Sequence, residues 1–90
     1  MTGRITPEVI RQMEANGQAR YEWVAAQAPD EDAREDGDLA ADYGNFEGAV
    51  LAYLETLATK NAIPEVVIER LCDDYPDGEY REILEPIFAL

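Results

Sequence analysis

Histidine is absent from the sequence and cysteine occurs once, and these two absences exclude most common catalytic and metal-binding sites. Without histidine there is no Ser-His-Asp set, and Cys72 alone can form neither an internal disulfide nor a thiolate zinc site. Cys72 follows Leu71 on the apolar side of a predicted helix, and the neighbouring Asp73 and Asp74 disfavour a reactive thiolate. We therefore interpret it as a small buried side chain. No Gly-rich phosphate loop is found, so we expect a protein that is not an enzyme and has no cofactor.

Basic residues are also scarce. Seven Lys and Arg residues stand against 20 Asp and Glu residues, which gives a formal net charge of −13 over 90 residues. A chain this acidic repels phosphate backbones and anionic lipid, so direct binding to nucleic acid or to a membrane surface is not expected. The hydrophobic fraction of 47% is too high for a disordered chain, and the length predicts one domain, residues 1–90.

Long apolar runs are missing as well. No window approaches the 18 or so consecutive apolar residues that a membrane-spanning helix needs. The first residues after Met1 lack the apolar stretch of a signal peptide. We therefore expect a cytoplasmic protein.

Apolar residues recur at the spacing of helices throughout most of the chain. Thr6 and Pro7 indicate a helix start, and a stripe from Ile10 to Ala28 predicts one helix that Pro29 ends. Asn16-Gly17 also resembles a helix C-cap, so a break into two shorter helices stays open.

Three further helices are predicted in the second half. One is capped by Asn45, carries an apolar face from Phe46 to Ala58, and ends at Lys60-Asn61. The next is opened by Pro64 and directs Val67, Ile68, Leu71, Cys72 and Tyr75 inward. The last follows the turn 76–78, with Asp77 as its cap, and Pro86 is expected to kink or end it.

Residues 30–38 contain no apolar side chain larger than alanine, so residues 29–38 are predicted to form an acidic loop, followed by a short helical turn at 39–43. No run shows the period-2 alternation of strands. The predicted fold is all-α: a small irregular bundle of four to five helices with an acidic loop after the first helix.

The negative charge is unevenly distributed. Residues 1–29 hold three acids and three arginines, so residues 30–90 carry the whole charge of −13. Glu65, Glu69 and Asp73 follow one another four residues apart and form a row with no cation among its members, and Asp38–Asp42 and Glu79–Glu82–Glu85 look similarly uncompensated. Like charges at this spacing destabilise a helix by roughly 0.2–0.5 kcal/mol per pair. Tolerated repulsion of this kind suggests that the acidic faces bind a partner.

The candidate binding residues fall into two acidic patches. The first comprises Asp30, Glu31, Asp32, Glu35, Asp36, Asp38 and Asp42, and the second Glu65, Glu69, Asp73, Asp74, Asp77 and Glu79.

Three aromatic residues are further candidates for contact with a partner. Trp23 points away from the apolar stripe of the first helix and is a candidate interface anchor, although packing under the acidic loop or against another helix is also open. Tyr43 and Tyr75 lie directly beside acids and could act in the same way.

Neither acidic segment fits a calcium loop, which needs ligands at positions 1, 3, 5 and 12 and a glycine at position 6. Counted from Asp36, positions 5 and 6 are Ala40 and Ala41. Counted from Asp73, positions 3 and 12 are Tyr75 and Leu84. We therefore predict no metal site.

In size, acidity and lack of enzymatic motifs, the chain resembles small phage-encoded inhibitor proteins such as anti-CRISPR proteins and DNA mimics. The resemblance lies in composition, so it carries no functional residue over to this chain. It implies a non-enzymatic inhibitor, active in the cytoplasm of a bacterial host. Its partner would be a basic, nucleic-acid-binding protein surface, such as that of a CRISPR effector, which it occludes.

Three other functions fit parts of the same pattern. An immunity protein or antitoxin that neutralises a basic toxin would use the same electrostatics. A halophilic protein would also be acidic, but its acids should cover every exposed face, whereas residues 1–29 are neutral. A helical adaptor or dimerisation module could self-associate through residues 1–29. We expect a monomer or a weak homodimer.

Overall fold

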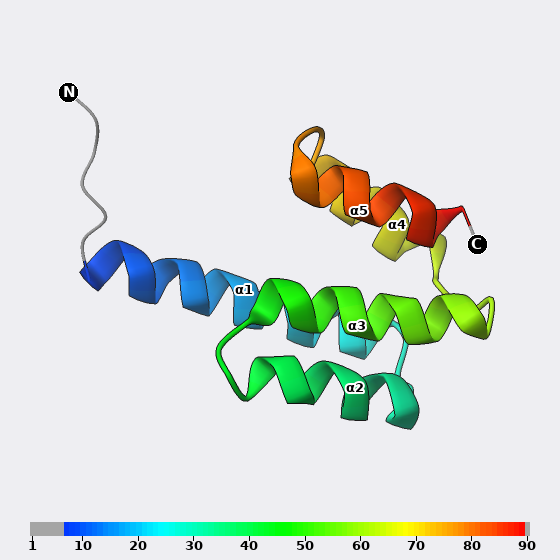
Figure 1. Cartoon of the computed structure of the whole chain (residues 1–90), viewed down its shortest axis with the longest axis horizontal. Helices are drawn as coiled ribbons and strands as arrows, with labels where there is room; N and C mark the ends of the chain where they lie inside the picture. Colours follow the sequence, from blue (N-terminus) through cyan, green and yellow to red (C-terminus); the bar gives the residue numbers. More distant parts are fainter. Residues whose placement is uncertain (1–6, 90) are drawn as a thin grey trace.

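The computed structural model describes residues 7–89, with the backbone alone for residues 9–14, and all regular structure in this range is helical. The five helices are α1 (Pro7–Gln27), α2 (Glu31–Ala41), α3 (Phe46–Thr59), α4 (Glu65–Asp74) and α5 (Glu79–Phe88) (Figure 1). The prediction of a small all-α bundle is confirmed. None of the described helices is both long and apolar enough to cross a membrane.

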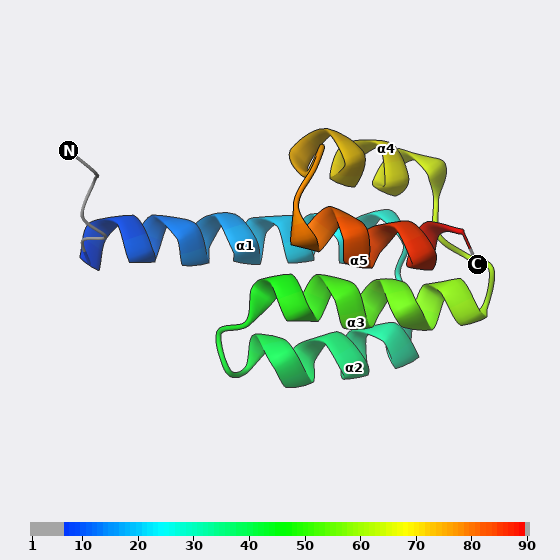
Figure 2. The same cartoon turned by 45° about the horizontal axis from the view of Figure 1, so that its top comes forward.

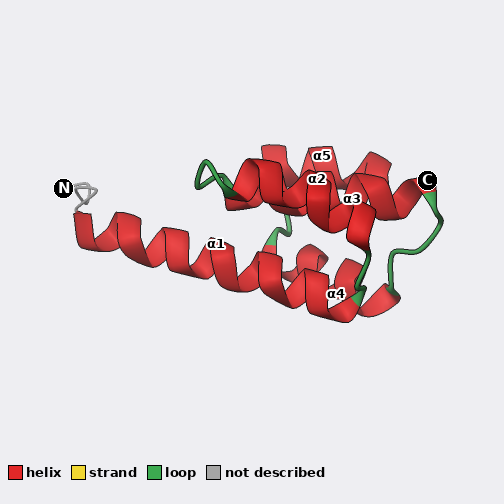
Figure 3. Ribbon diagram, turned by 90° about the horizontal axis from the view of Figure 1, so that it is seen from below, coloured by secondary structure: helices red, strands yellow, loops and turns green. Residues whose placement is uncertain are grey.

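The helices form two layers. α2, α3 and α5 lie side by side in one layer, with α3 in the middle, and α1 and α4 form the other (Figures 2 and 3). The N-terminal half of α1 extends beyond the other helices (Figure 1). α2 therefore lies at one edge of the molecule, and the α4–α5 pair lies on the far side of α3.

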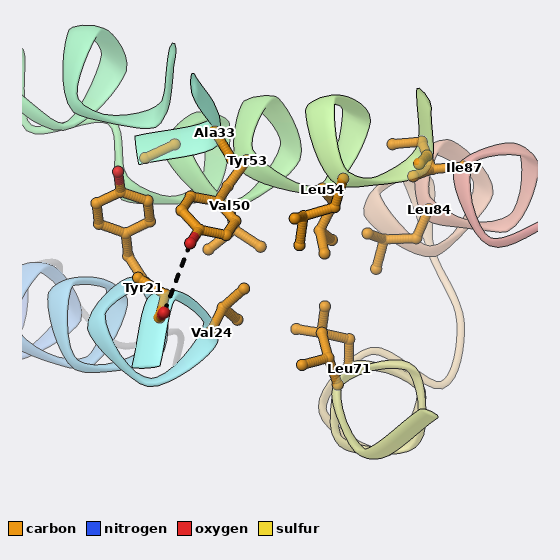
Figure 4. Close-up of a cluster of buried hydrophobic side chains, with 14 residues drawn as sticks. Tyr21, Val24, Ala33, Val50, Tyr53, Leu54, Leu71, Leu84 and Ile87 are labelled. Atoms are coloured by element: carbon orange, nitrogen blue, oxygen red, sulfur yellow. Dashed lines mark hydrogen bonds between the residues drawn. The ribbon is translucent and has the colours of Figure 1, made fainter. Parts of the chain in front are cut away.

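One continuous core joins all five helices. Its fully buried side chains include Tyr53 and Leu54 of α3, Val24 of α1, Leu71 of α4 and Leu84 of α5 (Figure 4). α3 supplies more of this core than any other helix because it alone has neighbours on both of its sides and beneath it. The predicted apolar faces of the second half therefore point inward, although Cys72 of α4 is only half-buried.

α1 runs without a break through Gly17, so the interpretation as one continuous helix is correct. A Cβ atom at Gly17 would lie 3.0 Å from Cβ of Phe46. The glycine is thus explained by the close approach of α3 to the middle of α1 rather than by a helix end. The predicted start at Thr6 lies outside the described residues, as do the side chains of Ile10 and Met13.

The prediction of an acidic loop at residues 29–38 is wrong, because this segment forms most of α2. Asp30 has extended backbone angles (φ −155°, ψ 122°), and its side chain accepts a hydrogen bond of 2.9 Å from the Ala33 N–H, which makes it the N-cap. Glu31 and Asp32 in the first turn interact favourably with the helix dipole. The expected short turn at 39–43 is the end of the same helix and the turn after it.

α2 is buried only at two of the smallest residues, Ala33 and Gly37. These two residues are four apart, so they lie on one side of the helix. Tyr21 of α1 packs directly against Gly37, and Tyr53 of α3 lies next to it, with the two tyrosine rings edge to face at 6.0 Å. Small residues thus let the backbone of α2 approach the two rings closely.

The Tyr53 hydroxyl joins the end of α1 to the start of α2. It accepts a hydrogen bond from the Asp30 N–H (3.1 Å) and donates to the Ala28 carbonyl (2.5 Å), and it lies 3.5 Å from the Ala25 carbonyl (Figure 4). Burial of the hydroxyl raises the pKa of Tyr53 above its ordinary value. One buried side chain of α3 therefore satisfies the backbone at the α1–α2 turn.

The remaining helix ends agree with the prediction at α3 and differ at α5. Asn45 caps α3 by accepting from the Gly48 N–H (3.0 Å), as predicted, and Lys60 follows its last residue. Asp77 does not cap α5, because the N-cap position is Gly78 (φ 99°), which makes no side-chain cap bond. α5 also continues through Pro86, since the buried Ile87 packs into the core and holds the last turn in place.

We expect Gly37→Ala to destabilise the protein by about 1–3 kcal/mol, although alanine is ordinarily the better helix former. A Cβ atom at this position would lie 2.7 Å from Cε1 of Tyr21 and closer still to its hydroxyl. Urea unfolding of the variant measures the change. Glu35→Ala, on the exposed side of the same helix, should change stability little. Unchanged or increased stability of Gly37→Ala would contradict the close packing of α2.

We expect Tyr53→Phe to cost about 1–3 kcal/mol, because it leaves the Asp30 N–H and the Ala28 carbonyl without their partner. Thermal unfolding of both proteins measures the cost. Tyr43→Phe is the matched control, since Tyr43 is 90% exposed, and should stay within about 0.5 kcal/mol of the parent. Equal effects of the two variants would refute the structural role of the Tyr53 hydroxyl.

Candidate protein-binding surface

Asp38, one of the predicted contact residues, is used to hold α2 against α1. It accepts a hydrogen bond of 2.8 Å from the Tyr21 hydroxyl and pairs with Arg34 Nε at 3.1 Å. Arg34 in turn binds both carboxylate oxygens of Glu22 on α1 at 2.9 Å. Burial, and next the hydrogen bond to Asp38, raises the pKa of Tyr21 far above its ordinary value. The prediction that Asp38 and Asp42 are both uncompensated is therefore wrong for Asp38, because that residue has a cation beside it.

Three further acids of the first patch face α3. Asp30 and Asp32 both contact Lys60 Nζ at 2.9 Å, and Asp36 accepts a hydrogen bond of 2.6 Å from the Thr56 hydroxyl. The Ala33 N–H, and then Lys60, holds the pKa of Asp30 below its usual value. Hydrogen bonds to Asp32 and Asp30 raise the pKa of Lys60. These carboxylates fix α2 to its neighbours.

Three exposed residues of α2, on the side opposite the buried Ala33 and Gly37, and the two residues that follow the helix form a row. Glu31, Glu35, Leu39, Asp42 and Tyr43 follow one another at steps of four, four, three and one, and all five are exposed. Glu31, Glu35 and Asp42 form no salt bridge with any residue between 7 and 89 whose side chain is described. We call these five residues the outer row of α2.

The second patch is partly neutralised. Asp74 pairs with Arg20 of α1 (3.1 Å) and with Arg70 (3.2 Å). Glu85, predicted to be part of an uncompensated row, pairs with Arg81 at 3.3 Å.

The other members of the second patch stay exposed. Glu65, Glu69 and Asp73 are exposed, and so are Asp77 and Glu79 beside the α4–α5 turn. None of these five acids has a cation within salt-bridge distance among the described residues.

The structure does not bring the two patches together. The first lies on α2 and the second on α4 and the start of α5, and α3 separates α2 from the α4–α5 pair (Figures 1 and 2). A single flat partner surface would therefore meet one patch at a time. This separation could not be predicted from the sequence, because the two segments are similarly acidic.

The aromatic candidates divide into two kinds. Trp23 is half-buried against the core, and the Arg70 guanidinium lies 5.1 Å from its ring, so it packs against α4. Tyr75 stacks on Tyr80 (4.3 Å between ring centres) and lies under the Arg20 guanidinium. Tyr43, in contrast, is 90% exposed. The alternative in which Trp23 packs against another helix agrees with these contacts.

A shallow apolar groove of about 360 Å³ lies between the end of α1 and the start of α2. Its lining includes Ala25, Ala26, Pro29 and Glu31. The groove holds no nucleophile paired with a base, so we find no catalytic arrangement in it. Within the described side chains, no three potential metal ligands gather closely enough to hold an ion.

Comparisons of the chain with protein-family models, curated proteins and solved structures give no match. Function is therefore inferred from the surface itself. Leu39 is not among the predicted contact residues, because a loop at 29–38 followed by a short helical turn at 39–43 defines no helix face on which it would lie. The signal that could have found it is the cap at Asp30 followed by small residues at 33 and 37, which places Glu31, Glu35 and Leu39 on the opposite face.

The lowered pKa of Asp30 predicts a contribution to stability that depends on pH. A carboxyl whose pKa is lower in the folded state stabilises that state fully above its unfolded pKa, and the contribution is lost as pH falls through the folded value. Asp30→Asn keeps a capping oxygen but loses the charge that Lys60 binds. We expect it to melt at a lower temperature than the parent at pH 6, and we expect the difference to disappear as pH falls through the folded pKa of Asp30.

Melting curves of parent and variant from pH 7 to pH 2 measure this difference. Glu35→Gln is the control, because Glu35 is exposed and outside any described salt bridge; its difference from the parent should be small at every pH. A deficit of Asp30→Asn that persists unchanged at pH 2 would contradict the charge-dependent role of Asp30.

Proposed function

We propose that this protein is a non-enzymatic acidic inhibitor that binds a basic, nucleic-acid-binding surface of a partner protein and occludes it. The candidate partner is a CRISPR effector or another nucleic-acid-handling complex in the cytoplasm of a bacterial host, as for phage-encoded inhibitors of the anti-CRISPR or DNA-mimic type. The outer row of α2 is the proposed main contact, and the exposed, unneutralised carboxylates of that row carry the proposal.

The charge density of α2 supports this proposal. From Asp30 to Asp42 the chain holds seven carboxylates and Arg34, and Lys60 packs against the same segment, so the local net charge is −5. The segment is about 20 Å long at the helical rise, which gives about one negative charge per 4 Å. One strand of DNA carries one charge per about 3.4 Å. A groove that holds a nucleic-acid strand would meet a similar density of negative charge on α2.

The rigidity of α2 supports the same proposal. Tyr21, Tyr53, Thr56 and Lys60 all form bonds to it from α1 and α3. The outer carboxylates are therefore displayed at fixed helical spacing, and less conformational entropy is lost when they bind. Complementary charge would speed association with a basic partner and make it sensitive to salt.

The proposal is tested by displacement of a fluorescent DNA oligonucleotide from purified bacterial complexes with basic channels, including a CRISPR effector bound to its guide. The parent protein should displace the DNA from at least one of them, more strongly at about 50 mM than at about 300 mM salt. Failure to displace DNA from any complex at either salt concentration would refute the proposed function.

A matched pair of triple variants locates the contact. Glu31→Gln, Glu35→Gln and Asp42→Asn together should weaken displacement about tenfold, whereas Glu65→Gln, Glu69→Gln and Asp73→Asn should change it by about twofold or less. Both triples remove three charges from exposed positions. Equal losses in both would mean that only the overall charge matters and would refute the assignment to α2.

A further inference from the structure

Two large apolar side chains, one at the end of α2 and one in the turn after it, remain exposed. Leu39 is 65% exposed and Tyr43 is 90% exposed, more than any other large hydrophobic residue between 7 and 89 whose side chain is described. Leu39 lies in the last turn of α2 and Tyr43 in the turn that follows the helix, so both stand at the end of the outer row. An exposed pair of this kind marks a contact site more often than scattered single residues do.

Tyr43 differs from the four other tyrosines of the chain. Tyr21 and Tyr53 are buried, with hydroxyls bonded to Asp38 and to the Ala28 carbonyl, and Tyr75 and Tyr80 stack on each other. Tyr43 has no such contact with a described residue. Fold stability therefore explains four tyrosines and leaves the fifth unexplained.

The backbone around Tyr43 is nevertheless well ordered. The Tyr43 and Asn45 N–H groups both donate to the Ala40 carbonyl, each at 3.1 Å, and the Gly44 N–H donates to the Ala41 carbonyl at 2.9 Å. Gly44 adopts φ 77°, which favours glycine and lets the chain turn directly into α3. The turn thus holds the backbone at Tyr43 in place, which lowers the backbone entropy lost on binding.

The charges around the pair define the partner. Glu35 and Asp42 flank it on the outer row, and Arg34, the one cation of α2, is already bound by Glu22 and Asp38. A second copy of this chain would bring a net charge of −13 against the same charge, and nucleic acid or anionic lipid would also be repelled. Charge complementarity therefore favours a basic protein.

We infer that Leu39 and Tyr43 are the apolar anchor of the α2 surface, and that they enter an apolar pocket bordered by lysine or arginine side chains on the partner. This inference deepens the proposed function and rests on it. Charged groups mainly set the rate of association and its salt dependence, whereas a buried aromatic anchor mainly sets the rate of dissociation. A nucleic-acid strand offers no such apolar pocket, so the anchor would give α2 a specificity that charge alone lacks.

The test uses two basic probe peptides of equal length, charge and helicity, about 16 residues long. One is an amphipathic helix of lysine and leucine, and the other replaces each leucine with alanine. Affinities are measured by fluorescence anisotropy. The parent protein should bind the leucine peptide at least about fivefold more tightly, and the double variant Leu39→Ala, Tyr43→Ala should lose this preference while still binding both peptides.

The control is the double variant Val66→Ala, Ile83→Ala, which truncates two other exposed side chains (46% and 48% exposed) on α4 and α5. It should keep the full preference, and circular dichroism should show unchanged helicity in both double variants. Absence of a preference in the parent, or a preference that survives in Leu39→Ala, Tyr43→Ala, would overturn the inference. Sedimentation in which the parent dimerises and this variant does not would overturn it in favour of a second copy.

Failure of the anchor and failure of the proposed function give different results. If the parent displaces DNA from a basic complex but shows no preference between the peptides, the inhibitor function stands and the anchor is refuted. If the parent prefers the leucine peptide through Leu39 and Tyr43 but displaces DNA from no complex, the anchor stands as a protein-binding feature. The occlusion of a nucleic-acid site is refuted in that case.

Discussion

The structure depends on the contact between α2 and the two tyrosines beneath it. α2 buries only Ala33 and Gly37, which is too little apolar surface to hold a helix by the hydrophobic effect alone. Close approach and polar contacts take its place, because Tyr21 and Tyr53 pack against the small residues while their hydroxyls bond to α2 and to the turn before it. Without this contact the outer row would have no fixed position.

The same contact divides the carboxylates of α2 into two groups. Asp30, Asp36 and Asp38 bond to Lys60, Thr56 and Tyr21 and so belong to the fold. The acids of the outer row have no such partner among the described residues and are free to meet a basic surface. Each helix also carries an acid in its first turn, where the helix dipole favours it. These arrangements explain how so small a bundle tolerates so much negative charge.

Much of the fold could be predicted because its signals are local. Asn45 and Lys60 mark the ends of α3, and the stripe along α1 continued through Gly17 as predicted. α2 was missed because apolar periodicity, the main signal of a helix, is replaced there by contacts with residues of other helices. The candidate site was predictable as a region but not residue by residue, since the sequence cannot tell Asp38, which bonds to Tyr21, from Asp42, which is exposed.

The sequence by itself determined the helical class, the end of α1, the bounds of α3, and the location of the whole net charge in residues 30–90, because caps, apolar spacing and composition are properties of neighbouring residues. Only the tertiary structure decided that residues 31–41 form a helix, that the acids of its outer row have no salt-bridge partner among the described residues, and that α3 separates the two acidic patches. Those features arise from contacts between residues distant in the chain, such as Tyr21 with Gly37 and Tyr53 with Asp30, and local sequence carries no record of which distant residues meet.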